Sequence, residues 1–160
     1  MDFEKSALAG YLANHMARLF AHALQTRVKP LGLTPGQFMA LLELWEAAPL
    51  TQKQLTERLD VEQATMANTL ARLERDGLIE RHAHPADGRA QLVHLTDRAR
   101  ALEEPAKQAA AAVNAEALVP LDAEERAALL HAMRRVIAAL SKQDAAQVFS
   151  SSQPEDRSRP

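Results

Sequence analysis

The stretch VEQATMANTLARLERDGLIERHAHPADGRAQLVHLT, residues 61–96, decides the fold of this chain. Its first half predicts a helix over about 62–76, because apolar side chains recur there at the spacing of one helix face. The side chains on this face are Met66, Leu70 and Leu73. Gly77 follows, at the position where a glycine often ends a helix. We therefore expect one face of this helix to be buried and the opposite face to be polar and exposed.

The second half of the stretch alternates apolar and polar residues around Asp87 and Gly88. This pattern predicts two strands, about 78–83 and 90–95, and Asp-Gly between such runs is a strong signal for a tight hairpin turn. Arg89 comes directly after the turn and is placed to reach an adjacent DNA minor groove, with an ion pair to Asp87 expected to hold it. The alternative is a plain type I′ turn that carries a solvated arginine.

A shorter helix is predicted just before this stretch. Thr51 is expected to cap it, with Gln54 three residues later as the partner in a capping box, and the helix runs to about Arg58. A tight turn at 59–61 separates it from the next helix. Helix, turn, helix, strand, turn, strand is the order of a helix-turn-helix motif with a β-hairpin wing, and such a motif lays its second helix in the DNA major groove.

The polar face of helix 62–76 carries side chains that suit base edges. Arginine can bridge two acceptors of guanine, asparagine or glutamine can pair with adenine, and threonine can contact a thymine methyl group. The candidates for DNA contact on this helix are Gln63, Thr65, Asn68, Thr69, Arg72 and Arg75. The preceding helix begins with Thr51, Gln52 and Lys53, where backbone N–H groups and a cation suit a phosphate. For each helix taken alone, the alternative is that its polar face is merely solvated. The wing beside these helices favours DNA contact instead.

Long helices are predicted on both sides of the motif. Their ranges are about 3–28, 35–48, 97–117 and 122–148. Thr34 with Gln37 forms a second predicted capping box, and Thr96 and Asp122 are expected to cap the later helices. The polar, proline-containing segment 149–160 predicts a disordered tail.

The composition is that of an ordinary globular protein and excludes several classes of function. The 160 residues are 47% hydrophobic and 25% charged, with a formal net charge of −2, so DNA affinity must come from placed cations and not from a bulk positive field. No cysteine is present, which excludes disulfides and thiolate metal sites. We find no catalytic or phosphate-loop motif, no secretory leader and no apolar run of roughly 20 residues for a membrane span. The sequence therefore predicts neither an enzyme, nor a cofactor, nor a membrane partner.

The stretch from Leu33 to Thr96, LTPGQFMALLELWEAAPLTQKQLTERLDVEQATMANTLARLERDGLIERHAHPADGRAQLVHLT, resembles the MarR family of bacterial winged-helix regulators. The D-x-R pattern of that family's wing matches Asp87 and Arg89. Many members have a second arginine where this chain has Gly88, so one phosphate-contacting charge is missing. The resemblance implies a mainly α fold with a small β-hairpin wing, in which a winged helix-turn-helix is flanked by long dimerisation helices.

The resemblance also implies how the chain divides and assembles. We expect an N-terminal dimerisation helix in 1–30, a DNA-binding domain in 31–96, C-terminal dimerisation helices in 97–148 and the tail in 149–160. Two chains would form a symmetric homodimer that places one winged helix on each half of a pseudo-palindromic operator, with half-sites about 10 base pairs apart. The implied action is repression of a nearby promoter, in the cytoplasm of a bacterium and on its nucleoid.

Release of the operator by a small molecule is a further implication of the resemblance. The effector would bind between the dimerisation helices and the DNA-binding lobes and shift the spacing of the lobes. His15, Phe38 and Trp45 are candidates to line a pocket for an aromatic acid, although a tryptophan on an apolar helix face more often belongs to the core.

Two other functions stay open at this point. The first is a winged-helix module that binds proteins and has lost DNA binding, which the net acidity and Gly88 favour slightly. The second is a metal-responsive regulator, because the chain has six histidines and some relatives of this family sense zinc. His15 and His22 are two helical turns apart, too far to hold one ion from that helix alone. His82, His84 and His94 could face each other across the wing strands, but no carboxylate-histidine cluster at i, i+4 spacing accompanies them, so no metal site is predicted.

Overall fold

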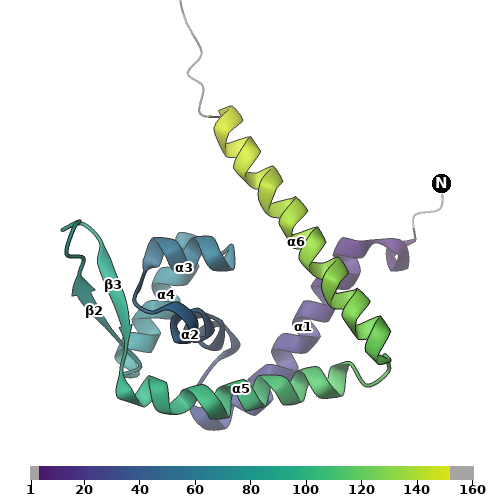
Figure 1. Ribbon diagram of the computed structural model, residues 1–160, viewed down its shortest axis with the longest axis horizontal. Helices are drawn as coiled ribbons and strands as arrows, with labels where there is room; N and C mark the ends of the chain where they lie inside the picture. The colour runs from purple at the N-terminus through teal and green to yellow at the C-terminus, as the bar shows by residue number, and fades with distance from the viewer. Residues whose placement is uncertain (1–3, 152–160) are drawn as a thin grey trace, which may run out of the picture. The chain divides into compact units, whose positions relative to one another are not determined.

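The computed structural model describes residues 4–151 of the chain, with side chains up to Ser141. Two compact units are present, Met1–Ala117 and Leu118–Pro160, and each is considered by itself. The first unit holds the helix-turn-helix and the wing (Figure 1). Its elements are η1 (Lys5–Ala7), α1 (Ala9–Val28), η2 (Lys29–Leu31), α2 (Pro35–Ala47), β1 (Leu50–Thr51), α3 (Gln52–Leu59), α4 (Gln63–Arg75), β2 (Ile79–Ala83), β3 (Gln91–Leu95) and α5 (Asp97–Ala117).

The fold class predicted from the sequence is confirmed, with one strand added. The three strands form an antiparallel sheet in the order β1-β3-β2, and β2 and β3 make the hairpin beside α3 and α4 (Figure 1). The sequence did not predict β1, in which Leu50 pairs with Val93 and Thr51 with Leu92. Two residues are too few to show alternation, so this strand exists only because β3 lies next to it. It ties the start of α3 to the wing.

The caps of the helix-turn-helix follow from local chemistry and are confirmed. The Thr34 hydroxyl accepts the Gln37 N–H while the Gln37 side chain accepts the Thr34 N–H, which starts α2. Thr51 and Gln54 make the same pair of bonds at the start of α3. Each box satisfies two N–H groups that a helix start leaves unpaired.

One predicted helix start is wrong, and the alternative type of wing turn is excluded. The first helix begins at Ala9 and not at residue 3, because Leu8 has an extended backbone that separates it from the 3-10 turn at 5–7. The turn expected at Asp87 and Gly88 is present, because the Ala90 N–H donates to the Asp87 carbonyl at 3.1 Å, and it lies within a loop of residues 84–90 between β2 and β3. Gly88 does not have the positive φ that a type I′ turn requires at its central residues, so this turn type is excluded.

A single core in the first unit fixes which face of α4 is exposed. Met66, Leu70 and Leu73 are each at most 2% exposed, as predicted, and pack with Leu55 of α3 and Leu41 of α2. Gly77 ends α4 with a φ of 69°, a conformation that glycine adopts without strain. The buried stripe leaves the opposite side of α4 to solvent.

The second unit is built on α6 (Ala123–Ser151). The Asp122 carboxylate accepts the Glu125 N–H and the Glu125 carboxylate accepts the Asp122 N–H, which confirms the predicted cap. The helix runs three residues past the predicted end at 148, and the rest of the predicted tail lies outside the described residues. No helix in residues 4–151 is both long enough and apolar enough to cross a membrane.

Candidate nucleic-acid interface

The start of α3 lies at the surface with its polar groups partly engaged. The Thr51 hydroxyl is committed to the cap, where it accepts the Gln54 N–H at 3.1 Å. The Gln52 amide donates to Gln63 Oε1 of α4 at 3.3 Å, so these two predicted contact residues are joined. The Lys53 side chain is 78% exposed and only loosely paired with Glu57, at 3.9 Å. Lys53 is therefore the cation at this helix start that is free to meet an anion.

The predicted contact residues of α4 form one solvent-facing surface. Gln63, Thr65, Asn68 and Arg72 are exposed, and Thr69 is half-buried. The Thr69 hydroxyl donates to the Thr65 carbonyl at 2.9 Å, which occupies its proton but leaves its lone pairs available. Within residues 4–141, Arg72 makes no side-chain hydrogen bond or ion pair, so its guanidinium is available to a ligand.

Arg75 differs from Arg72 although both project from the same helix. Its Nε donates to Asp76 Oδ1 at 2.9 Å. This hydrogen bond raises the pKa of Arg75 and, with the Gln37 bond, lowers the pKa of Asp76. Arg75 is thus partly neutralised by its neighbour, and Arg72 is the stronger candidate for a base contact.

The wing loop holds Arg89 by its backbone. The Arg89 N–H donates to Asp87 Oδ1 at 3.0 Å, and the Ala90 N–H donates to the Asp87 carbonyl at 3.1 Å. The expected ion pair between the two side chains is absent from the described residues, because the carboxylate accepts the amide instead. The guanidinium of Arg89 stays exposed and unpaired within that part of the chain.

A hollow of about 520 Å³ lies between the wing and the start of α3. We call it the wing hollow. Its lining is Thr51, Gln52, Lys53, Arg81, His84, Asp87, Arg89, Ala90, Gln91 and Val93. The fold therefore brings together the predicted contact residues of α3 and of the wing tip. Lys53, Arg81 and Arg89 give it three cations against one carboxylate, a balance that suits a phosphate group.

Sequence reasoning missed three polar residues of the wing hollow, Arg81, His84 and Gln91. The period of a strand gave a signal for them. Arg81 and Ala83 are two residues apart and so share one face of β2, and the register sets Ala83 opposite Gln91. The Arg81 Nε lies 3.3 Å from Glu74 Oε2, which ties the wing to α4. This cross-element contact could not be read from the sequence.

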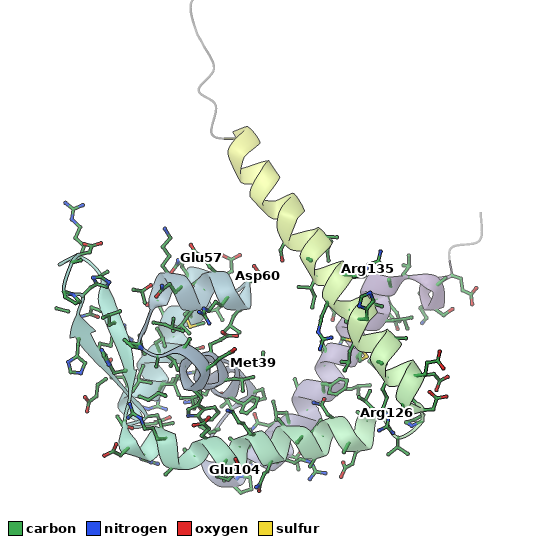
Figure 2. All side chains as sticks on the ribbon, in the orientation of Figure 1. Met39, Glu57, Asp60, Glu104, Arg126 and Arg135 are labelled. Carbon is green, nitrogen blue, oxygen red and sulfur yellow. The ribbon has the colours of Figure 1, made fainter. Side chains whose placement is uncertain are left out.

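The first unit also contains an apolar cavity of about 540 Å³ between α1, α2 and α5. Its lining is Ala17, Phe20, Ala21, Leu24, Pro35, Phe38, Met39, Leu42, Ala110, Val113 and Asn114. Figure 2 shows Met39 on the side of α2 that faces α1. Asn114 is the polar side chain of this lining, so the cavity suits an apolar or aromatic molecule with few polar groups.

The three predicted pocket residues are not brought together at this cavity. Phe38 lines it, whereas Trp45 and His15 do not. The Trp45 ring lies 6.2 Å from that of Phe38, edge to face, and its Nε1–H donates to the Ala99 carbonyl at 3.0 Å. The exposed His15 ring lies 6.3 Å from that of Tyr11.

The histidines do not form a metal centre in the part of the chain that the structure describes. No group of three or more histidine, aspartate or glutamate side chains there is arranged to hold an ion. His82 and His94 face each other across the strands with their rings 4.8 Å apart, and His82 Nε2 lies 3.3 Å from Glu80 Oε2. These contacts account for two of the histidines without a metal.

Comparison with known proteins points to one family. The sequence profile of the MarR family matches residues 33–90. The organic hydroperoxide resistance transcriptional regulator of Bacillus subtilis (strain 168) is 40% identical over 76 residues, which are 48% of this chain and 52% of the relative. The match thus spans about half the length of that curated relative.

Three solved structures extend the similarity to most of the chain. A probable transcriptional regulator from Pseudomonas aeruginosa is 33% identical, with a TM-score of 0.77 over 83% of this chain and 99% of that one. The PcaV transcriptional regulator from Streptomyces coelicolor, in complex with its natural ligand, is 28% identical, with a TM-score of 0.79 over 88% and 99%. A mutant of MarR from E. coli, complexed with operator DNA, is 28% identical, with a TM-score of 0.77 over 85% and 99%.

Proposed function

Because the chain belongs to the MarR family of winged helix-turn-helix regulators, DNA-binding transcription regulators that are not enzymes, we propose that it binds one operator sequence and controls a nearby promoter. The observation that carries this proposal is the surface made by the exposed face of α4 and the cation-lined wing hollow. Unpaired Arg72 and Arg89 lie on that surface. A module that bound only proteins would have no physical need to keep both arginines free.

The proposed mode of binding assigns a part of the DNA to each element. Helix α4 enters the major groove, where Gln63, Asn68 and Arg72 meet base edges. Arg89 at the wing tip enters the adjacent minor groove, which attracts an inserted arginine by its negative potential. The phosphate backbone between the two grooves lies over the wing hollow, where Lys53 contacts it. Gly88 leaves the wing with one cation fewer than many relatives have.

Assembly into a homodimer is part of the proposal. On α6, Met133, Val136, Ile137 and Leu140 form a stripe at helical spacing, and each is between 37% and 58% exposed. In the first unit, Leu12 and Leu19 of α1 are 49% and 59% exposed. Apolar stripes of this size are commonly covered by a partner, and a second copy offers the same stripes in return. A twofold dimer would present two α4 helices to a pseudo-palindrome.

Repression released by an effector is the finer part of the proposal. A bound aromatic molecule in the apolar cavity would contact α1, α2 and α5 together. The molecule would shift the chain toward the conformation in which this cavity is best filled. The E. coli relative was solved with operator DNA and the Streptomyces relative with a ligand, which supports both activities for this chain. Such a regulator would act on the nucleoid, in the cytoplasm.

Fluorescence anisotropy tests the central claim. The purified protein is titrated onto labelled DNA from upstream of its own gene and onto a scrambled DNA, across a salt series. We expect tighter binding to the upstream DNA, with an affinity that falls steeply as salt rises. Selection from random DNA follows if the upstream DNA is not bound. Failure to enrich any sequence in that selection would overturn the proposal and favour the protein-interaction module.

The metal-responsive alternative is separated by the same assay. Zinc added to the protein–DNA complex should leave the anisotropy unchanged if the effector is organic. Release by micromolar zinc, reversed by a chelator, would favour the metal-responsive regulator.

A further inference from the structure

The imidazole of His84 organises the loop that carries Arg89. His84 is the first residue of the wing loop, and its Nδ1 accepts the N–H of Ala86 at 3.1 Å and that of Asp87 at 3.2 Å. Its backbone N–H donates to the Ala90 carbonyl at 3.0 Å, which closes the loop at its base. One side chain therefore fixes the backbone on the side of the loop that leads into Asp87.

The bonds continue from Asp87 to Arg89. The Asp87 carboxylate accepts the Arg89 N–H at 3.0 Å, and the Asp87 carbonyl accepts the Ala90 N–H at 3.1 Å. The N–H of Asp87 is itself held by His84 Nδ1 at 3.2 Å. Hydrogen bonds thus run from the His84 imidazole through Asp87 to the backbone of Arg89.

These contacts define the chemical form of the ring. A nitrogen that accepts two N–H groups must carry a lone pair, so these two contacts require the form of the His84 ring that has its proton on Nε2. The charged groups that line the wing hollow with His84 are Lys53, Arg81, Asp87 and Arg89. Three of these four are cations, so a further positive charge on His84 is not needed to attract phosphate.

We propose that His84, as the neutral Nε2–H tautomer, is a positioning residue that sets Arg89 for the minor groove by accepting two backbone N–H groups of the wing loop. The inference rests on the proposed function, since it names a residue on which the DNA surface depends. His84 acts here as an acceptor, and protonation of Nδ1 would remove both bonds.

The variants His84→Asn, His84→Gln and His84→Ala test this role on the full-length protein. The Oδ1 of asparagine stands close to where Nδ1 stands in histidine, so His84→Asn keeps the acceptor without an imidazole. The glutamine oxygen lies near the position of Nε2 and does not replace it. His82→Ala is the matched control, because His82 contacts His94 and Glu80 and makes no hydrogen bond to the loop within the described residues.

In anisotropy titrations on the operator, His84→Ala and His84→Gln should each bind about tenfold more weakly than wild type, which corresponds to the loss of two ordinary hydrogen bonds. His84→Asn and His82→Ala should stay within about twofold of wild type. Equal affinities for wild type and His84→Ala would overturn the inference while leaving the proposed function intact. Weakening by His84→Asn as large as that by His84→Ala would also overturn it, because the ring itself would then be needed.

Nitrogen-15 NMR gives a readout that does not depend on DNA. At pH 8 the His84 ring should show the pattern of the Nε2–H tautomer, and His84→Ala should shift the Arg89 amide while His82→Ala should not. A ring with its proton on Nδ1 overturns the inference even if no operator is found. If wild type binds no DNA but His84 shows the expected tautomer, the proposed function is wrong. The loop then has no role in DNA binding.

Discussion

The Gln37 amide donates to Asp76 Oδ2 at 3.0 Å and so joins the start of α2 to the end of α4. Gln37 is only 3% exposed, and the same side chain completes the cap of α2. Asp76 also accepts from Arg75, and its backbone carbonyl accepts from Arg98 of α5 at 2.8 Å. The end of the proposed recognition helix is therefore held by two other elements, α2 through Gln37 and α5 through Arg98.

Asp76→Ala should destabilise the protein at neutral pH by about 1.5–3 kcal/mol, the usual value for hydrogen bonds to a charged group. The bonds from Arg75 and Gln37 hold the pKa of Asp76 below its usual range. A carboxylate with a lowered folded pKa adds stability above its unfolded pKa of about 3.9, and this stability is lost as the pH falls through the folded value. The difference between wild type and variant should therefore shrink below about pH 4.

Urea unfolding at a series of pH values measures this effect. Glu46→Ala is the control, since Glu46 is exposed and makes no side-chain hydrogen bond or ion pair in the described residues. A constant difference between wild type and Asp76→Ala from about pH 7 to about pH 3 would show that the carboxylate charge does not matter.

Arg72→Ala should cost roughly 1–3 kcal/mol of binding free energy on the selected operator if the side chain reads a guanine. It should have much less effect on scrambled DNA. Arg75→Ala is the matched comparison on the same helix, and its smaller expected effect follows from the Asp76 pairing. Anisotropy of wild type and both variants on both DNAs gives the six affinities that this comparison needs. An Arg75→Ala loss greater than that of Arg72→Ala would reverse the assignment.

Arg89→Ala should weaken binding to many sequences to a similar degree. The loss of one phosphate-proximal cation should also lower the slope of log affinity against log salt concentration by about one. The measurement is a salt series for wild type and variant on operator and scrambled DNA. A loss confined to one base position would instead make Arg89 a direct reader of sequence.

Sequence and structure agree where local chemistry is sufficient. The Thr51 and Gln54 cap needs only two side chains three residues apart, and the buried stripe through Leu70 needs only helical spacing. The wing loop could not be predicted in the same way, because Asp-Gly is compatible with several turns and the bonds from the loop to His84 Nδ1 do not follow from the residue types. The difference between Arg72 and Arg75 depends on Asp76, whose carboxylate is turned toward α2 by the fold.

Ile137→Asp should shift the protein from dimer toward monomer. The side chain is 58% exposed in the single chain, and an aspartate there would have to be desolvated in any interface that covers the stripe. Ala138→Asp is the control, since Ala138 lies on the other side of α6 from the centre of the stripe. Sedimentation velocity over a concentration series gives the mass, and anisotropy should show weaker operator binding by Ile137→Asp. Equal masses for all three proteins would exclude this face as the interface.

Ligand entry into the apolar cavity should change the fluorescence of Trp45. This is the chain's single tryptophan, and its ring touches that of Phe38, which lines the cavity. Benzyl alcohol and benzoate are a suitable pair of probes, because they share a ring and differ in charge. The lining contains Asn114 but no cation that could pair with the carboxylate of benzoate. Benzyl alcohol should therefore bind this cavity more tightly than benzoate.

Ala21→Phe should abolish this signal, because the larger side chain fills a cavity that Ala21 lines. Ala13→Phe is the control on the same helix, at an exposed position outside the lining. Tighter binding of benzoate than of benzyl alcohol would require a cation beyond the lining residues of one chain. In that case the cation could come from the second copy of the dimer. Repeating the titration with Ile137→Asp tests this.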